Sequence, residues 1–167
     1  MTLIQRSSPS GYALFCDEVR REDNGKFIHL GVFLSEMVIN SPALPTRLPR
    51  LSVVINYYEK VGESTEPVRF VVFLPGEEAP AGEFILKKPE GPAPPPPPDV
   101  EGEAPGDPLM HVALVLDIQD PVFKQEGRVR VRAFRGEDEI RLGTLKVKWN
   151  QIAPPDQAQT EPPPKSN

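Results

Sequence analysis

Residues 127–149 read GRVRVRAFRGEDEIRLGTLKVKW, and this stretch is the strongest indication of the fold class. In its first half, apolar residues alternate with arginines, as they do in a β-strand that buries one face. The pair Gly136-Glu137 then provides a two-residue turn, and apolar residues alternate again on the return. The stretch therefore predicts an antiparallel hairpin with strands at 127–135 and 139–149.

The apolar residues of the return strand change parity within this hairpin. They are even-numbered at Ile140 and Leu142 and odd-numbered from Leu145 onward. Because side chains alternate between the two faces of a strand, both groups can face the core only if one extra residue is inserted between them. We expect a β-bulge near Gly143-Thr144.

Similar apolar segments, bounded by Gly, Pro, Asn and Asp, recur about every ten to fifteen residues from Tyr12 to Trp149, a spacing typical of all-β domains. No segment shows a helical period over three turns. The simplest arrangement that buries these segments is a two-sheet antiparallel β-sandwich of about eight strands. We expect strands near residues 12–20, 26–33, 50–58, 67–74, 83–87, 109–118, 127–135 and 139–149.

Two proline-rich segments are not expected to join this fold. Residues 89–108 hold nine prolines and five acidic residues and almost no large aliphatic side chain. Such a segment cannot bury enough surface to offset the entropy of ordering, so we expect a disordered insert that serves as a spacer, although a polyproline ligand for an aromatic groove is an alternative. Residues 153–167 predict a disordered tail. The chain is thus a single domain at 1–152 followed by that tail.

Composition and motifs exclude several classes of function. A net charge of −5 opposes chain-wide attraction to nucleic acid or to an anionic membrane, and no window approaches the apolar length of a bilayer span. One cysteine cannot form an internal disulfide, which fits a cytoplasmic protein. The chain contains no phosphate-binding glycine loop, serine-hydrolase elbow, zinc-protease motif or dinucleotide fingerprint. We therefore expect no catalytic residue, no cofactor and no enzyme activity.

Metal binding has little support in the sequence. The single cysteine and the two histidines, His29 and His111, are far apart and lack ligand spacing, so we expect no metal site. Acidic residues do gather in turns, as at Asp117 and Asp120. Such clusters are compatible with calcium loops, but solvated turn residues are the simpler interpretation.

Asp17 is the one acidic residue whose expected position conflicts with its charge. It shares strand parity with Phe15 and Val19, so an unbroken strand would turn its carboxylate toward the core. A buried carboxylate must find hydrogen-bond donors or raise its pKa. Asp17 is therefore either an acid at a ligand pocket or a structural carboxylate.

The neighbouring Cys16 does not form a catalytic pair in this interpretation. Asn24-Gly25 predicts a two-residue type I′ turn, which pairs Cys16 with Phe33 and Arg20 with His29. The cysteine and the histidine then lie too far apart along the hairpin to share a hydrogen bond. We expect Cys16 to be a small buried residue.

Basic residues gather on one face of the hairpin at 127–149. They could form a docking surface for an acidic partner, a phosphate ligand or the chain's own acidic residues 99–107. Alternatively, they are the solvated face of a sheet, charged to prevent edge pairing. No aromatic residue is expected among them, which argues against binding of single-stranded nucleic acid. The six residues are Arg128, Arg130, Arg132, Arg141, Lys146 and Lys148.

The N-terminal residues resemble the opening of a family of small bacterial proteins without an assigned activity. That opening has a tyrosine-alanine pair, a cysteine, two acids, an arginine, a further acid, a glycine-lysine turn and a glycine. The second acid is more often aspartate in the family, and it is Glu18 here. The resemblance implies a bacterial, cytoplasmic, single-domain β protein of unknown function and transfers no catalytic residue. The matching positions are Tyr12, Ala13, Cys16, Asp17, Glu18, Arg20, Glu22, Gly25, Lys26 and Gly31.

Two functional hypotheses follow. The first is a non-enzymatic β-sandwich that binds an unknown protein partner or assembles with itself as a homo-oligomer. The second is a domain that senses a small molecule or a metal ion through Asp17 and the acidic turns.

Overall fold

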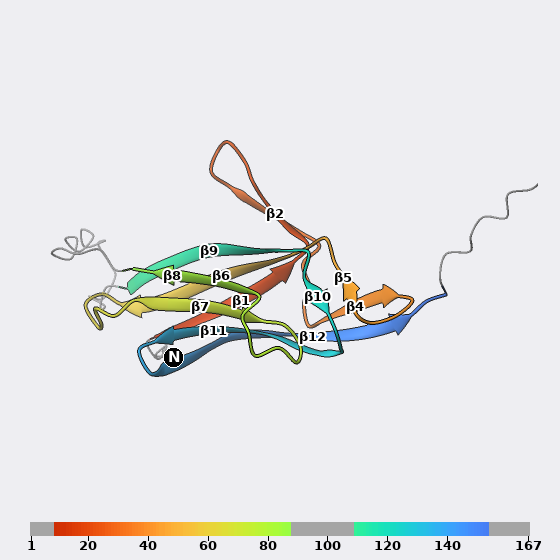
Figure 1. The fold of residues 1–167 in the computed structure, drawn as a ribbon. Helices are drawn as coiled ribbons and strands as arrows, with labels where there is room; N and C mark the ends of the chain where they lie inside the picture. The colour runs from red at the N-terminus through yellow and green to blue at the C-terminus, as the bar shows by residue number, and fades with distance from the viewer. Residues whose placement is uncertain (1–8, 88–108, 154–167) are drawn as a thin grey trace, which may run out of the picture.

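The computed structural model describes residues 9–87 and 109–153, and every regular element in these ranges is a β-strand (Figure 1). The prediction of an all-β fold is confirmed, and these ranges hold no helix that could span a membrane. The predicted insert at 89–108 and all but the first residue of the predicted tail at 153–167 lie outside the described residues. The strands are β1 (Ser10–Cys16), β2 (Glu18–Arg21), β3 (Phe27–Leu30), β4 (Glu36–Ser41), β5 (Thr46–Arg47), β6 (Arg50–Lys60), β7 (Val68–Phe73), β8 (Gly82–Leu86), β9 (Leu109–Gln119), β10 (Val122–Phe123), β11 (Gly127–Arg135) and β12 (Asp138–Gln151).

Two main sheets build the body of the molecule. One has three strands in the order β1-β6-β9, and the other has five in the order β4-β12-β11-β7-β8; β2-β3 and β5-β10 form two small ribbons. Every pair is antiparallel except β4 with β12, which run parallel. The expectation of a purely antiparallel arrangement is therefore wrong. The strands from β5 to β11 lie between β4 and β12 in the chain, so no hairpin turn imposes an antiparallel direction on this pair.

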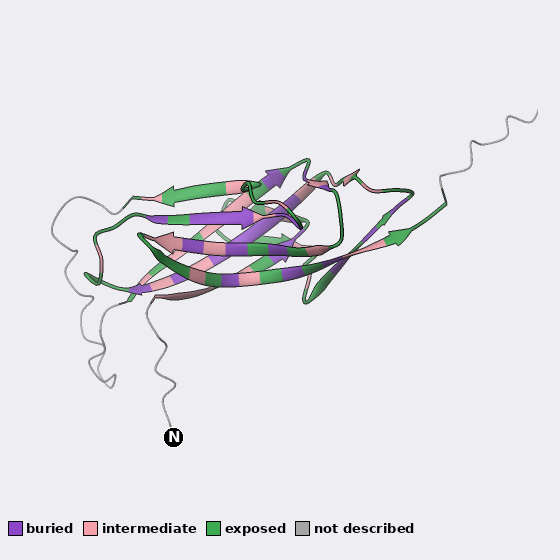
Figure 2. Cartoon of the chain, turned by 60° about the horizontal axis from the view of Figure 1, so that its bottom comes forward, coloured by how far each residue is buried: buried purple, intermediate pink, exposed green. Residues whose placement is uncertain are grey.

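The inner faces of the two sheets share one hydrophobic core. Along β11 and β12 buried residues alternate with more exposed ones, as one-sided burial requires (Figure 2). Tyr57 of β6 and Phe70 of β7 meet edge to face across the sheets, with ring centroids 5.4 Å apart. Full burial of each large apolar side chain stabilises the fold by about 1.5–3 kcal/mol before entropy is counted. The completely covered members include Leu51, Val53, Ile55, Val68, Phe70, Val72, Val129, Val131 and Ala133.

The last hairpin agrees with its prediction. Its strands are β11 and β12, and Gly136, with a φ of 57°, opens the two-residue turn. The pairing shifts by one residue between Val131, opposite Gly143, and Arg132, opposite Arg141, so Leu142 is the extra residue of a bulge. The bulge expected near Gly143-Thr144 is confirmed to within one residue. It keeps the apolar residues on both sides of it directed to the core.

The first hairpin differs from its prediction. The amide of Gly25 donates to the carbonyl of Glu22 at 3.0 Å, and Gly25, rather than Asn24, has a positive φ, of 82°. The loop therefore has three residues, a type I turn closed by a left-handed glycine, and the type I′ turn is wrong. The register moves by one, so that Val19 lies opposite His29. Phe15, not Cys16, forms the bridge to Phe33.

The strand expected at 12–20 breaks at Asp17. β1 ends at Cys16, and β2 and β3 continue as a ribbon that projects from the body (Figure 1). The ribbon leaves Phe27 and Ile28 exposed. β4, β5 and β10 were not expected, so the estimate of about eight strands is too low.

Candidate functional site

The six basic residues of β11 and β12 lie together on the outer face of the five-stranded sheet. The intervening residues of β11, such as Val129 and Val131, are buried in the core, which turns the arginines of that strand outward. The pairing places Arg128 opposite Lys146 and Arg132 opposite Arg141. We call this surface the basic face; it consists of Arg128, Arg130, Arg132, Arg141, Lys146 and Lys148.

Aromatic residues lie among these basic residues, contrary to the expectation from the sequence. The guanidinium of Arg130 lies over the ring of Phe73, its partner on β7, at 5.2 Å from the centroid. Arg69 of β7 lies over Phe134 of β11 in the same way, at 5.9 Å. Each contact is a cation–π interaction of about 0.5–1 kcal/mol at an exposed site. Phe134 was visible in the sequence, but the position of Phe73 depends on the pairing of β7 with β11.

Arg132 occupies the middle of the basic face. Its Nε donates to Glu139 Oε1 at 2.7 Å and its Nη1 donates to the carbonyl of Val131 at 2.9 Å. Opposite it on β7 lies Val71, which is fully buried although it faces outward. Arginine stems bury apolar surface while their charged ends stay in water, so the long side chains of this face can account for the burial of Val71.

A shallow open hollow of about 410 Å³ lies over this part of the face. Two acidic residues, Glu78 and Glu139, line it together with the arginines and the two phenylalanines. It is lined by Phe73, Glu78, Arg130, Arg132, Phe134, Glu139 and Arg141.

The charges of the basic face are only partly neutralised. Lys148 Nζ lies 2.7 Å from Glu36 Oε2, and this hydrogen bond lowers the pKa of the Glu36 carboxyl. Arg130 donates to the backbone carbonyl of Glu77 at 3.1 Å rather than to a carboxylate. Within residues 9–87 and 109–153, no acidic side chain forms an ion pair with the remaining three, Arg128, Arg141 and Lys146. The face therefore presents net positive charge to the solvent.

Asp17 does not face the core. It lies exposed in the bend between β1 and β2. The strand ends at Cys16, so the alternation of side chains along β1 no longer determines the direction of Asp17. Its amide donates to the carbonyl of Leu30 at 3.0 Å. Its carboxylate lies against Gly31, which has a φ of 64° and no room for a side chain on that side. The expectation of a core-facing carboxylate is therefore wrong.

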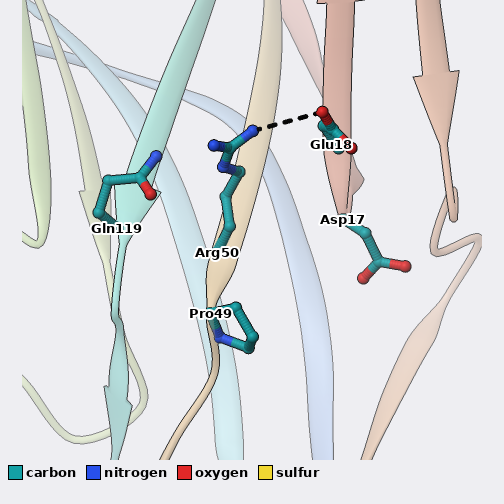
Figure 3. Close-up of a pocket in the computed structure, with 5 residues that line it drawn as sticks. All are labelled: Asp17, Glu18, Pro49, Arg50 and Gln119. Atoms are coloured by element: carbon teal, nitrogen blue, oxygen red, sulfur yellow. Dashed lines mark ion pairs between the residues drawn. The ribbon is translucent and has the colours of Figure 1, made fainter.

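Asp17 does line an open pocket of about 490 Å³ (Figure 3). There Arg50 Nη1 lies 3.7 Å from Glu18 Oε1, while the carboxylate of Asp17 points away from Arg50. A hydrogen bond from Arg20 holds the pKa of Glu18 below its usual value. The lining residues are Asp17, Glu18, Pro49, Arg50 and Gln119.

Cys16 is buried, as expected. Its Sγ donates a weak hydrogen bond to the carbonyl of Ser52 at 3.7 Å. Burial raises the pKa of the Cys16 thiol, and the carboxylates of Asp117 and Asp17 raise it further. A buried thiol with a raised pKa is a poor nucleophile. His29 lies exposed on the projecting ribbon, opposite Val19.

The sequence interpretation missed a buried polar cluster at one end of the core. Glu59 of β6 is fully buried and accepts a hydrogen bond from Tyr57 Oη at 2.9 Å. Its Oε1 lies 3.5 Å from Nη1 of Arg135 on β11. Burial raises the pKa of the Tyr57 phenol, and the hydrogen bond to Glu59 raises it further. Glu59 is odd-numbered, like Leu51 and Tyr57, so strand alternation directs it to the core. The strand expected at 50–58 ends one residue too early to include it.

No metal-binding cluster occurs in the described part of the chain. There, no group of three or more His, Cys, Asp or Glu side chains is arranged to hold a metal ion.

Comparison with known proteins gives a family but no activity. A model of a family of unknown function, DUF6941, matches residues 11–148. The predicted membership of a family without an assigned activity is thereby confirmed. No curated protein and no solved structure matches the chain.

Proposed function

The chain belongs to this family of unknown function, and we propose that it is a non-enzymatic binding module whose basic face docks an acidic segment of a partner protein. The observation that carries the proposal is the gathering of six basic side chains on one sheet face of a chain with a net charge of −5. Three of them, Arg128, Arg141 and Lys146, form no ion pair with a described acidic residue.

Charge explains how such a face would select its partner. A single exposed ion pair contributes only about 0.2–1 kcal/mol, so one contact would not hold a partner. Several contacts on one face act together and also steer an oppositely charged segment toward it. Arg128 and Lys146 lie opposite one another beside the hollow, so they would extend the contact along the strands.

Charge reversal tests the proposal. The variant Arg128→Glu/Arg141→Glu should bind a fluorescent peptide of glutamate, leucine and serine at least about tenfold more weakly than the wild type, a change of about 1.4 kcal/mol. The control Arg21→Glu/Lys26→Glu makes the same change of charge on the projecting ribbon, where both residues are exposed. Equal losses in the two variants would indicate a general charge effect and would contradict a docking role for the basic face.

Self-assembly is the other form of this proposal. In the described part of the chain β9 pairs with β6 on one side only, and such a long, nearly uncharged edge strand is a template for pairing with another chain. Sedimentation velocity over a range of protein concentrations tests this form. If the variant Arg128→Glu/Arg141→Glu still forms a dimer, the dimer assembles through the edge of β9 rather than through the basic face.

The pocket beside Asp17 is a second candidate, as a small-molecule or metal-ion sensor. Its open volume and the exposed carboxylate of Asp17 favour it. A ligand that binds only the folded state raises the melting temperature, so a thermal-shift screen with calcium and with small metabolites tests it. A shift that Asp17→Asn abolishes would support this site; no shift with any compound would count against it.

A further inference from the structure

We propose that the hollow on the basic face binds an apolar side chain of the acidic partner segment, so that the module recognises an apolar residue flanked by carboxylates. This inference rests on the proposed docking function and makes it more specific. It follows from the position of Phe73 and Phe134 within the basic face.

Three facing pairs of β7 and β11 lie at the hollow, and four of their residues, Phe73, Arg130, Arg132 and Phe134, line it. Phe73 lies opposite Arg130, and Phe134 lies opposite Arg69. Between them the fully buried Val71 lies opposite Arg132. Each pair therefore sets one apolar group beside one cationic group, and the two phenylalanines lie on different strands, on either side of the pair formed by Val71 and Arg132.

This pairing of apolar with cationic groups suits a ligand of mixed chemistry. The side chain of Arg132 is only 14% exposed, and its Nε is already bonded to Glu139. Its neighbour Arg141 also lines the hollow and forms no ion pair with a described acidic residue. Ring edges and arginine stems can thus cover an apolar side chain, while Arg141 and Arg128 attract the carboxylates beside it. A purely acidic segment would leave the rings of Phe73 and Phe134 uncovered.

The same surface is a poor platform for nucleic-acid bases. Stacking requires an open aromatic face, and a guanidinium already lies over each ring, Arg130 over Phe73 and Arg69 over Phe134. The carboxylates of Glu78 and Glu139, which line the hollow, would repel a phosphate backbone. An acidic peptide can place its carboxylates over Arg141 and Arg128 and an uncharged residue beside Glu78 and Glu139, whereas a nucleic acid carries a charged phosphate at every nucleotide.

Two peptides that differ in one residue test the inference on the wild-type protein. Both carry flanking glutamates and serines, and one has a central leucine where the other has alanine. The leucine peptide should bind at least about fivefold more tightly in fluorescence polarisation, because it buries additional apolar surface. Equal affinities would overturn the apolar specificity while leaving the docking proposal intact. Failure of both peptides to bind would contradict the docking proposal itself.

Variants of the protein test whether Phe134 produces the preference for leucine over alanine. Phe134→Ala should reduce the ratio between the two affinities to near one, whereas Phe84→Ala should leave it unchanged. Phe84 is a suitable control because it is 42% exposed on the edge strand β8, outside the hollow. Thermal unfolding of each variant shows whether it is folded; if Phe134→Ala is not, the peptide pair on the wild type decides. Tighter binding of an oligothymidine than of the leucine peptide would overturn the proposal in favour of a nucleic-acid surface.

Discussion

Glu59 Oε1 lies 3.5 Å from Arg135 Nη1, and this ion pair joins the two main sheets, because Glu59 belongs to β6 and Arg135 to β11. Glu59 is fully buried, and the side chain of Arg135 is 11% exposed. Nη1 of Arg135 also lies 3.9 Å from Glu63, and Nη2 lies 3.4 Å from Asp138. The pair is therefore the inner end of a charged network that reaches the surface.

Removing the inner carboxylate should destabilise the fold strongly. Glu59→Gln leaves the guanidinium of Arg135 in the interior without its buried partner, and breaking such a pair costs about 3 kcal/mol. Urea unfolding measures this loss. The matched control is Glu63→Gln, which removes a more exposed carboxylate from the same arginine and should cost less than about 1 kcal/mol. Equal losses of unfolding free energy in the two variants would contradict a larger contribution from the buried carboxylate of Glu59.

Stability should fall with rising pH above about 10, the ordinary pKa of tyrosine. Burial and the hydrogen bond to Glu59 raise the pKa of Tyr57 in the folded state. Above that pH the unfolded chain releases the phenol proton while the folded chain retains it, so the folded state binds more protons and loses stability as pH rises. Urea unfolding across this range should show a shallower decline for Tyr57→Phe. An identical slope in the variant would contradict the raised pKa.

Cys16 should be unreactive toward an aromatic disulfide reagent in the native protein. Its side chain is fully buried and burial raises its pKa, so the thiolate forms only when the region opens. Labelling should be slow in buffer and complete within the mixing time in concentrated urea. Rapid stoichiometric labelling of the folded protein would show that the thiol is accessible.

Gly31→Ala should destabilise the protein more than Gly25→Ala. Both glycines have positive φ, which costs an alanine about 1–2 kcal/mol. A Cβ at residue 31 would also displace the carboxylate of Asp17, whereas nothing lies near a Cβ at residue 25. Thermal unfolding measures both variants. Adding Asp17→Ala to Gly31→Ala should recover part of the loss; the absence of recovery would show that Asp17 and Gly31 are not coupled.

The parts of the fold that follow local alternation could be predicted from the sequence. The hairpin of β11 and β12 and its bulge are encoded in the parity of neighbouring apolar residues. The break at Asp17 was not predictable in this way. β1 ends at Cys16, which pairs with the distant Ser52, and the chain then leaves the sheet. β4 was missed because its partner is the remote end of β12, so no turn beside it indicates the pairing.

The same limit applies to the candidate site. The basic face is visible in the sequence because its six residues belong to one hairpin. The placement of Phe73 beside Arg130 depends on the pairing of β7 with β11, which joins segments far apart in the chain. Non-local pairing of this kind leaves no local signature, so the hollow and its aromatic floor appear only in the structure.

An NMR titration of the labelled protein with the glutamate-leucine peptide tests the central claim most directly. Binding at the basic face should shift the backbone amides of β7, β11 and β12, with the largest changes near Phe73, Arg132 and Phe134. Shifts confined to the outer face of β1, β6 and β9, or to the pocket around Asp17, Arg50 and Gln119, would contradict it.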